Sequence, residues 1–146
     1  MPAWFLLVAL QYRDPKLVLY ILILIWTADI SAFFIGRRFG RHRLAPSISP
    51  GKTWEGVLGA LSVSFIIIAF GYPILQPGMS ILNWVVLGVI SVIFSVIGDL
   101  LESSYKRIRN VKDSGTLLPG HGGMLDRLDS LIAAIPVFTI GFMFFS

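Results

Sequence analysis

Long apolar runs alternate with short polar segments along the chain. Four runs are long enough to cross a bilayer, which takes about 20 helical residues at a rise of 1.5 Å each. They cover residues 17–36, 57–75, 81–101 and 125–145. A fifth run, residues 3–10, is too short to cross and lacks the charged start of a signal peptide. The pattern predicts an all-α integral membrane protein, a polytopic helical bundle of about four transmembrane helices.

The composition favours a bilayer over water. Hydrophobic residues make up 55% of the chain, charged residues 14%, and the mean hydropathy is +0.80. In lipid, 146 residues amount to one bundle, so we expect a single membrane domain over residues 1–146. We interpret residues 3–10 as the tail of an earlier helix. The chain is then expected to be the C-terminal part of a longer protein whose N-terminal helices are missing here, although Met1 permits a genuine start.

The basic residues are strongly biased toward two loops, residues 36–54 and 102–127. The turn at residues 72–80 between the second and third spans has no basic residue. Such a bias predicts that both basic loops face the cytosol. The local charge suits an anionic lipid or a nucleotide better than a nucleic acid, but a role in topology alone stays open, above all for residues 37–43. The two loops contain ten of the twelve basic residues: Arg37, Arg38, Arg41, Arg43, Lys52, Lys106, Arg107, Arg109, Lys112 and Arg127.

Acidic residues cluster near the same predicted interface. Asp29 and Asp99 lie inside apolar spans, where each costs about 3 kcal/mol unless it is paired or hydrated. Asp99 and Glu102 are three residues apart, as are Asp126 and Asp129, so each pair shares a helix face if the helix is continuous. Carboxylates are the hard ligands that magnesium prefers. The alternatives are structural ion pairs for Asp29 and Asp99 and favourable helix-start charges for Asp126 and Asp129.

A glycine-rich loop precedes the last span. Gly120, His121, Gly122 and Gly123 can approach a ligand closely and present backbone N–H groups at a helix start, which suits a phosphate. His121 could donate to a phosphate oxygen or act as an acid. A plain turn with a hydrogen-bonded surface histidine is the alternative.

Residues 49–53 resemble a phosphate-binding P-loop only in part. The first glycine of that motif would fall at Pro46, and no strand is expected before it. Lys52, on a turn at a helix start, remains a candidate phosphate ligand, with helix capping and topology as the alternative. Gly56, Ala60 and Ser64 form a stripe of small residues that we interpret as helix packing.

Together these residues resemble the phosphatidate cytidylyltransferases, or CDP-diacylglycerol synthases. The signature of that family runs from a Ser through Lys-Arg, Lys-Asp, a small residue and a Pro to His-Gly-Gly and a final Asp-Arg-apolar-Asp. Residues 49–55 and 98–103 also look like family segments, so the resemblance extends from residue 17 to the C-terminus; Tyr105 departs from the usual aliphatic residue or Phe. The residues in register are Ser103, Lys106, Arg107, Lys112, Asp113, Gly115, Leu118, Pro119, His121, Gly122, Gly123, Met124, Asp126, Arg127, Leu128 and Asp129.

The resemblance implies transfer of a cytidylyl group from CTP to phosphatidate, which gives CDP-diacylglycerol and pyrophosphate, at the cytosolic face of a membrane. It implies one or two divalent cations, magnesium foremost, with an additional monovalent cation as a further candidate. The implied partners are CTP, phosphatidate and membrane lipid, with a homodimer as one way to bury apolar faces. The implied metal ligands are Asp99, Asp126 and Asp129; the implied catalytic residues are Asp99, Asp126, Lys106, Arg107 and His121; the implied substrate-binding residues are Lys52, Lys112, Gly122, Gly123 and Arg127.

Three other functions compete with this interpretation. A transporter for a divalent cation or a phosphorylated solute would use the intramembrane acids as its pathway, but it predicts acids spread across the bilayer. A CDP-alcohol phosphotransferase needs a different order of aspartates, which is absent from this sequence. A non-catalytic bundle subunit is the last alternative.

Overall fold

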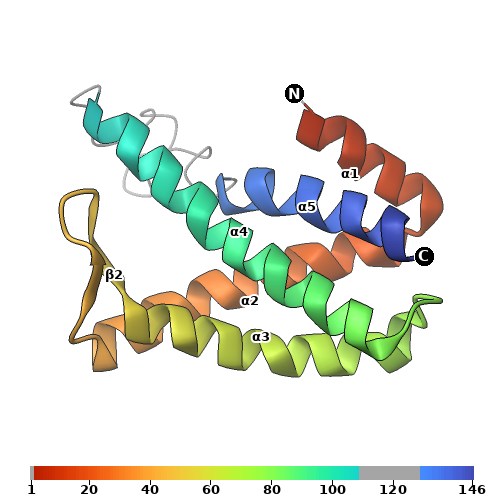
Figure 1. The fold of residues 1–146 in the computed structure, drawn as a ribbon, viewed down its shortest axis with the longest axis horizontal. Helices are drawn as coiled ribbons and strands as arrows, with labels where there is room; N and C mark the ends of the chain where they lie inside the picture. Colours follow the sequence, from red (N-terminus) through yellow and green to blue (C-terminus); the bar gives the residue numbers. More distant parts are fainter. Residues whose placement is uncertain (1, 109–128) are drawn as a thin grey trace.

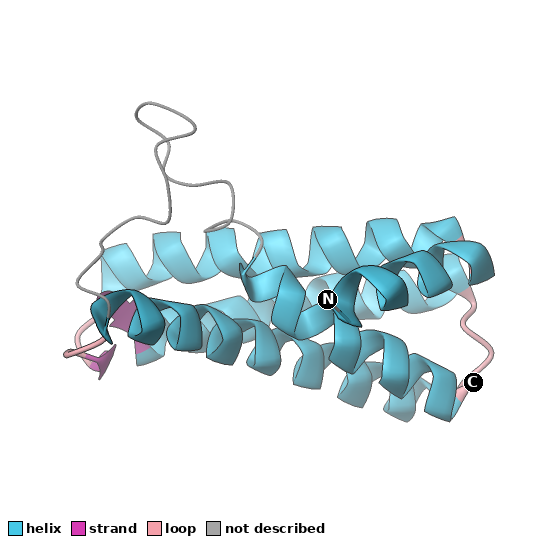
Figure 2. Cartoon of the chain, turned by 90° about the horizontal axis from the view of Figure 1, so that it is seen from above, coloured by secondary structure: helices cyan, strands magenta, loops and turns pink. Residues whose placement is uncertain are grey.

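A computed structural model of the chain describes residues 2–108 and 129–146. Within these residues, apolar helices lie side by side and a short hairpin closes one end of the bundle (Figures 1 and 2). Helices α2 and α3 pack along one another, α4 packs against α3 and α5, and α1 packs against α5 and α2. The elements are α1 (Pro2–Arg13), α2 (Pro15–Phe39), β1 (Arg43–Ala45), β2 (Ser49–Thr53), α3 (Trp54–Leu75), α4 (Ile81–Ile108) and α5 (Asp129–Phe145).

The helical membrane architecture predicted from the sequence is confirmed. In the described part of the chain, α2, α3 and α4 are long and apolar enough to cross a membrane. The fourth predicted span corresponds to α5, which has 17 described residues, while residues 125–128 of that prediction lie outside the described residues. The short run at residues 3–10 forms the 12-residue helix α1.

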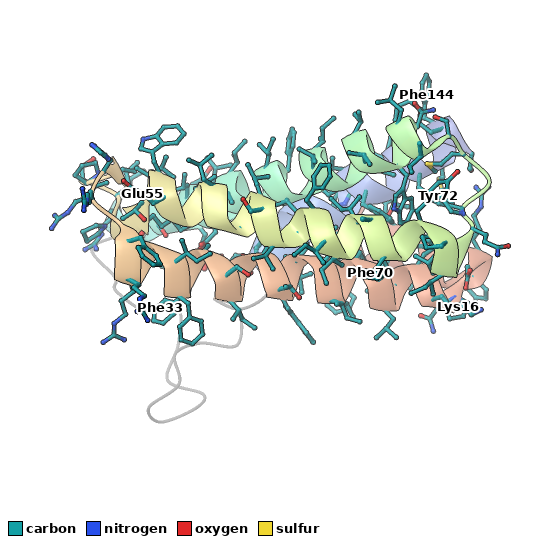
Figure 3. The ribbon with its side chains drawn as sticks, turned by 90° about the horizontal axis from the view of Figure 1, so that it is seen from below. Lys16, Phe33, Glu55, Phe70, Tyr72 and Phe144 are labelled. Atoms are coloured by element: carbon teal, nitrogen blue, oxygen red, sulfur yellow. The ribbon has the colours of Figure 1, made fainter. Side chains whose placement is uncertain are left out.

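Buried aromatic rings hold the centre of the bundle together. Tyr20 of α2 lies 4.8 Å from Trp84 of α4 and 5.8 Å from Phe138 of α5, measured between ring centroids. The indole of Trp84 donates a 2.9 Å hydrogen bond to the carbonyl of Ile68, so its polar N–H is satisfied inside the core. Large apolar side chains also cover the outside, including the labelled Phe33, Phe70 and Phe144 of Figure 3, as lipid contact requires.

The hairpin was missed by the sequence interpretation, which expected a loop at residues 36–54 and no strand before Lys52. Instead β1 and β2 pair antiparallel, with Arg43 opposite Thr53 and Ala45 opposite Ser49. The strands have three and five residues, too few for alternating polarity to reveal them. Because an isolated two-stranded hairpin is marginally stable, this one depends on its contacts with the helices.

Helix α4 is longer than predicted. The apolar span ends near residue 101, but the helix continues to Ile108. Lys106 and Glu102 form a 2.8 Å ion pair at four-residue spacing, which supports the polar last turns. Lys106 and Arg107 therefore lie on a helix and not in the loop where the sequence interpretation placed them.

Candidate functional site

A cavity of about 770 Å³ opens at the hairpin end of the bundle, where α2, β2, α3, α4 and α5 meet. One side of its wall is apolar, with Trp26, Ile30 and Phe33 of α2 exposed at the surface. The cavity is therefore amphipathic and lies within a membrane bundle. Its polar lining residues are Asp29, Ser49, Lys52, Thr53, Asp99 and Ser130.

Two glycines bring Lys52 to this cavity. A methyl group on Gly56 would lie 2.8 Å from the carbonyl oxygen of Ala32, and one on Gly36 would lie 2.9 Å from Oγ1 of Thr53. Helices α2 and α3 thus touch through their backbones at this point, an approach that a larger residue would prevent. Thr53 caps α3 by accepting a 3.1 Å hydrogen bond from the N–H of Gly56, so the strand residue Lys52 is held beside α2.

Lys52 forms an ion pair with Asp99. Its Nζ contacts Oδ2 of Asp99, which joins β2 to α4 across the cavity. The two side chains are 23% and 39% exposed, so both charges are accessible at the cavity. The lysine accounts for the presence of a carboxylate in an apolar helix, as the structural alternative for Asp99 expected. It also brings a predicted phosphate ligand into contact with a predicted cation ligand.

Asp29 lines the same cavity from α2. Its Oδ2 accepts a 2.6 Å hydrogen bond from the hydroxyl of Ser130, in the first turn of α5. Asp29 and Asp99 both line this cavity, one from α2 and the other from α4. Ser130 was missed by the sequence interpretation; the only available signal was a polar residue directly after Asp129 at a helix start.

The start of α5 lies against α4. Asp129 is buried, and a methyl group on Gly98 would lie 3.3 Å from the carbonyl oxygen of Asp129. Gly98 directly precedes Asp99, so the close helix contact brings the backbones around these two predicted metal ligands together.

Arg107 contacts the hairpin. Its Nε donates a 3.3 Å hydrogen bond to the carbonyl of Ile48, in the turn between β1 and β2. Lys106 pairs with Glu102, as described above. Among the described residues, neither Lys106 nor Arg107 belongs to the cavity wall. In this structure Arg107 supports the hairpin that bears Lys52, a role that the sequence did not indicate.

A second contact fixes the other end of the hairpin. Nδ1 of His42 lies 2.7 Å from Oε1 of Glu55, and the backbone N–H of His42 donates to both oxygens of the same carboxylate at 3.2 and 3.3 Å. Glu55 lies in the first turn of α3, and Figure 3 shows it at the hairpin end of the bundle, far from Lys16 and Tyr72. His42 and Glu55 thereby tie the start of the hairpin to the helix that follows it.

The remaining predicted site residues lie outside the described residues. They are Lys112, His121, Gly122, Gly123, Asp126 and Arg127.

Two described carboxylates could contribute ligands to a cation site. Asp29 and Asp99 offer carboxylate oxygens in the cavity wall, and these are suitable ligands for a hard cation. No three His, Asp or Glu residues within residues 2–108 and 129–146 gather closely enough to hold a metal ion. A complete set would therefore need a ligand such as Asp126 from the rest of the chain.

Comparison with known proteins identifies the family. Residues 1–145 match the cytidylyltransferase family. The chain is 51% identical over 137 residues to a phosphatidate cytidylyltransferase of Haemophilus influenzae, covering 91% of this chain and 48% of that protein. It is 50% identical over 141 residues to that of Pseudomonas aeruginosa (94% and 52%), and 42% identical over 125 residues to that of Staphylococcus aureus (84% and 47%). The chain spans about half the length of these curated relatives, and it belongs to the cytidylyltransferase family.

Proposed function

We propose that the protein containing this chain transfers a cytidylyl group from CTP to phosphatidate, giving CDP-diacylglycerol and pyrophosphate for phospholipid biosynthesis. Family membership and the names of the relatives support this reaction. The observation that carries the proposal is the Lys52–Asp99 ion pair in an amphipathic cavity at the basic end of a membrane bundle.

The cavity suits a phospholipid acid as one substrate. Its apolar wall on α2 continues onto exposed Trp26, Ile30 and Phe33, where acyl chains can remain in lipid. The cationic Lys52 provides a charge for a phosphate at the polar end. The acyl chains of the lipid thus match the apolar wall of the cavity, and its phosphate matches the polar end.

The reaction needs charge compensation more than a base. A phosphate oxygen of phosphatidate, already anionic near neutral pH, attacks the α-phosphorus of CTP; a P–O bond forms there as the bond to pyrophosphate breaks. The obstacle is the approach of two anions and the charge on the departing pyrophosphate. Lys52 can exchange its contact with Asp99 for one with a phosphate, which would leave the carboxylate free for a cation.

Magnesium fits this scheme as the cofactor. Asp99 would hold it together with Asp126 and Asp129, and the bound cation would neutralise phosphate charge. Lys106, Arg107, Lys112, His121 and Arg127 remain proposed phosphate contacts, and Gly122 and Gly123 remain a proposed phosphate-binding loop.

We propose that the hairpin end faces the cytosol. Arg37, Arg38, Arg41 and Arg43 are exposed around the end of α2 and the hairpin, as the positive-inside rule requires. Among the described acids, all except Asp14 belong to the hairpin half of the bundle, which supports a site at one interface over a transport path across the membrane.

The test is an assay of the full-length protein in detergent with lipid. Labelled CTP and phosphatidate with magnesium should give labelled CDP-diacylglycerol and pyrophosphate, and ATP should not replace CTP. The proposal would be refuted if no product formed with CTP or with ATP. Magnesium flux into proteoliposomes without product formation would refute it as well.

A further inference from the structure

Asp29 interrupts an apolar helix, and no ion pair within residues 2–108 and 129–146 accounts for it. A carboxylate in the middle of a span costs about 3 kcal/mol unless it is paired or hydrated. Asp29 is half-buried in the wall of the same cavity as Lys52 and Asp99, but the ion pair of Lys52 is with Asp99. The hydrogen-bond partner of Asp29 in the structure is the hydroxyl of Ser130.

This hydrogen bond connects distant parts of the chain. At 2.6 Å it has the length expected for a hydroxyl bound to an ionised carboxylate, a class stronger than neutral hydrogen bonds. Ser130 is buried, so little water competes for its hydroxyl. The bond joins α2 to the first turn of α5, 101 residues later in the chain.

The first turn of α5 is therefore held from two sides. Ser130 ties it to α2, and the close approach of Gly98 to the backbone of Asp129 holds it against α4. Asp129 precedes Ser130, and Asp99 follows Gly98. The two contacts thus fix the relative position of the segments that bear the two predicted cation ligands.

We propose that Asp29 is a positioning residue that acts through Ser130, fixing the start of α5, and Asp129 with it, against the cavity that holds Lys52 and Asp99. This inference rests on the proposed function. Oδ2 of Asp29 accepts the hydrogen bond of Ser130, and Lys52 pairs with Asp99, so Asp29 acts on the site through Ser130 and not by contact with the reacting phosphates.

A double-mutant cycle in the full-length protein tests this role. Asp29→Ala and Ser130→Ala should each lower kcat/KM about tenfold and raise the magnesium midpoint, because each removes one charge-assisted hydrogen bond. The double variant should be no worse than the more impaired single variant, since both changes break one interaction. Asp29→Asn and Ser130→Thr keep an acceptor and a donor, and should stay within about threefold of the wild type. Ser31→Ala is the matched control, because the Ser31 hydroxyl donates to the carbonyl of Thr27 within α2 itself.

The magnesium midpoint is read both from turnover and from protection against thermal unfolding by magnesium with CTP. Additive losses in the double variant, or an Asp29→Asn protein as impaired as Asp29→Ala, would overturn the inference in favour of direct contact with ligand. Variants that melt earlier while keeping the wild-type magnesium midpoint would overturn it in favour of a purely structural bond. A wild type that is protected but makes no CDP-diacylglycerol would contradict the proposed function instead, and the protection midpoints would still decide the role of Asp29.

Discussion

Nζ of Lys52 forms an ion pair with Oδ2 of Asp99, so the strand that enters α3 is joined to α4 at the polar end of the cavity. When substrate binds, a phosphate can pair with the lysine and a metal ion can bind the carboxylate, so that the two side chains separate. Both partners are partly exposed, so the exchange requires little burial of charge.

Removal of the Lys52 charge should impair turnover far more than folding. Lys52→Met keeps most of the side-chain length but loses the cation, and we expect a loss of about a hundredfold in kcat/KM, equal to about 2.7 kcal/mol. Lys52→Arg should retain a larger part of the rate. The measurement is steady-state turnover with the melting temperature recorded in parallel. The control is Lys16→Met, at the far end of the bundle; an equal loss in both variants would exclude a specific role for Lys52 (Figure 3).

The contact of Gly36 with Gly56 should tolerate no added methyl group. Gly56→Ala would place a carbon 2.8 Å from the carbonyl oxygen of Ala32 and should destabilise the protein by about 1–3 kcal/mol, as overpacking does. The control is Gly51→Ala in β2, where the new methyl group would meet nothing within 4 Å. Thermal unfolding in detergent compares the two. Equal melting temperatures would show that the α2–α3 contact is looser than described.

The contact between His42 and Glu55 should affect turnover, because it anchors the hairpin that bears Lys52. Glu55→Ala removes the acceptor for both the ring and the backbone N–H of His42, so the hairpin loses one of its anchors. We expect a loss of about three- to tenfold in kcat with a smaller change in melting temperature, since one to two hydrogen bonds are lost. Glu55→Gln keeps an acceptor oxygen and should retain more activity than Glu55→Ala. The idea fails if Glu55→Ala turns over like the wild type.

The absence of cysteine from the chain allows a clean test of topology. A single cysteine at Arg41, in the exposed segment before β1, should react with an impermeant thiol reagent only from the cytosolic side. A cysteine at Gly78, in the turn between α3 and α4, should react only from the opposite side. Labelling of both from one side would contradict the orientation.

The sequence predicted the helices well because their signal is strong. Nearly continuous apolar runs about 20 residues long have few alternatives, and α2, α3 and α4 match them. The polar end of α4 was predicted less well. The predicted span ends with the apolar run near residue 101, whereas the helix continues to Ile108, and the ion pair of Glu102 with Lys106 supports these last turns. The hairpin was invisible because three- and five-residue strands have no reliable period, and its stability comes from contacts with Glu55 and Arg107.

The site was predicted in its composition more than in its contacts. The cost of a charge in an apolar helix singled out Asp29 and Asp99, and both line the cavity. Their partners could not be predicted, because they lie far away in the sequence. Lys52 is 47 residues before Asp99, and Ser130 is 101 residues after Asp29, so helix packing is what brings each pair together. The contact of Arg107 with the backbone of the hairpin could not be predicted either, and the catalytic role implied for Arg107 stays a prediction.

Turnover against magnesium concentration in the Asp99→Asn protein tests the central claim most directly. The change keeps the size of the side chain and removes the charge that Lys52 now balances. If Asp99 and Lys52 separate to take up a cation and a phosphate, kcat should fall about a hundredfold or more and the magnesium midpoint should rise, in protein that remains folded and membrane-inserted. A near-normal rate with an unchanged magnesium midpoint would show that the Lys52–Asp99 pair is structural and that cytidylyl transfer takes place elsewhere.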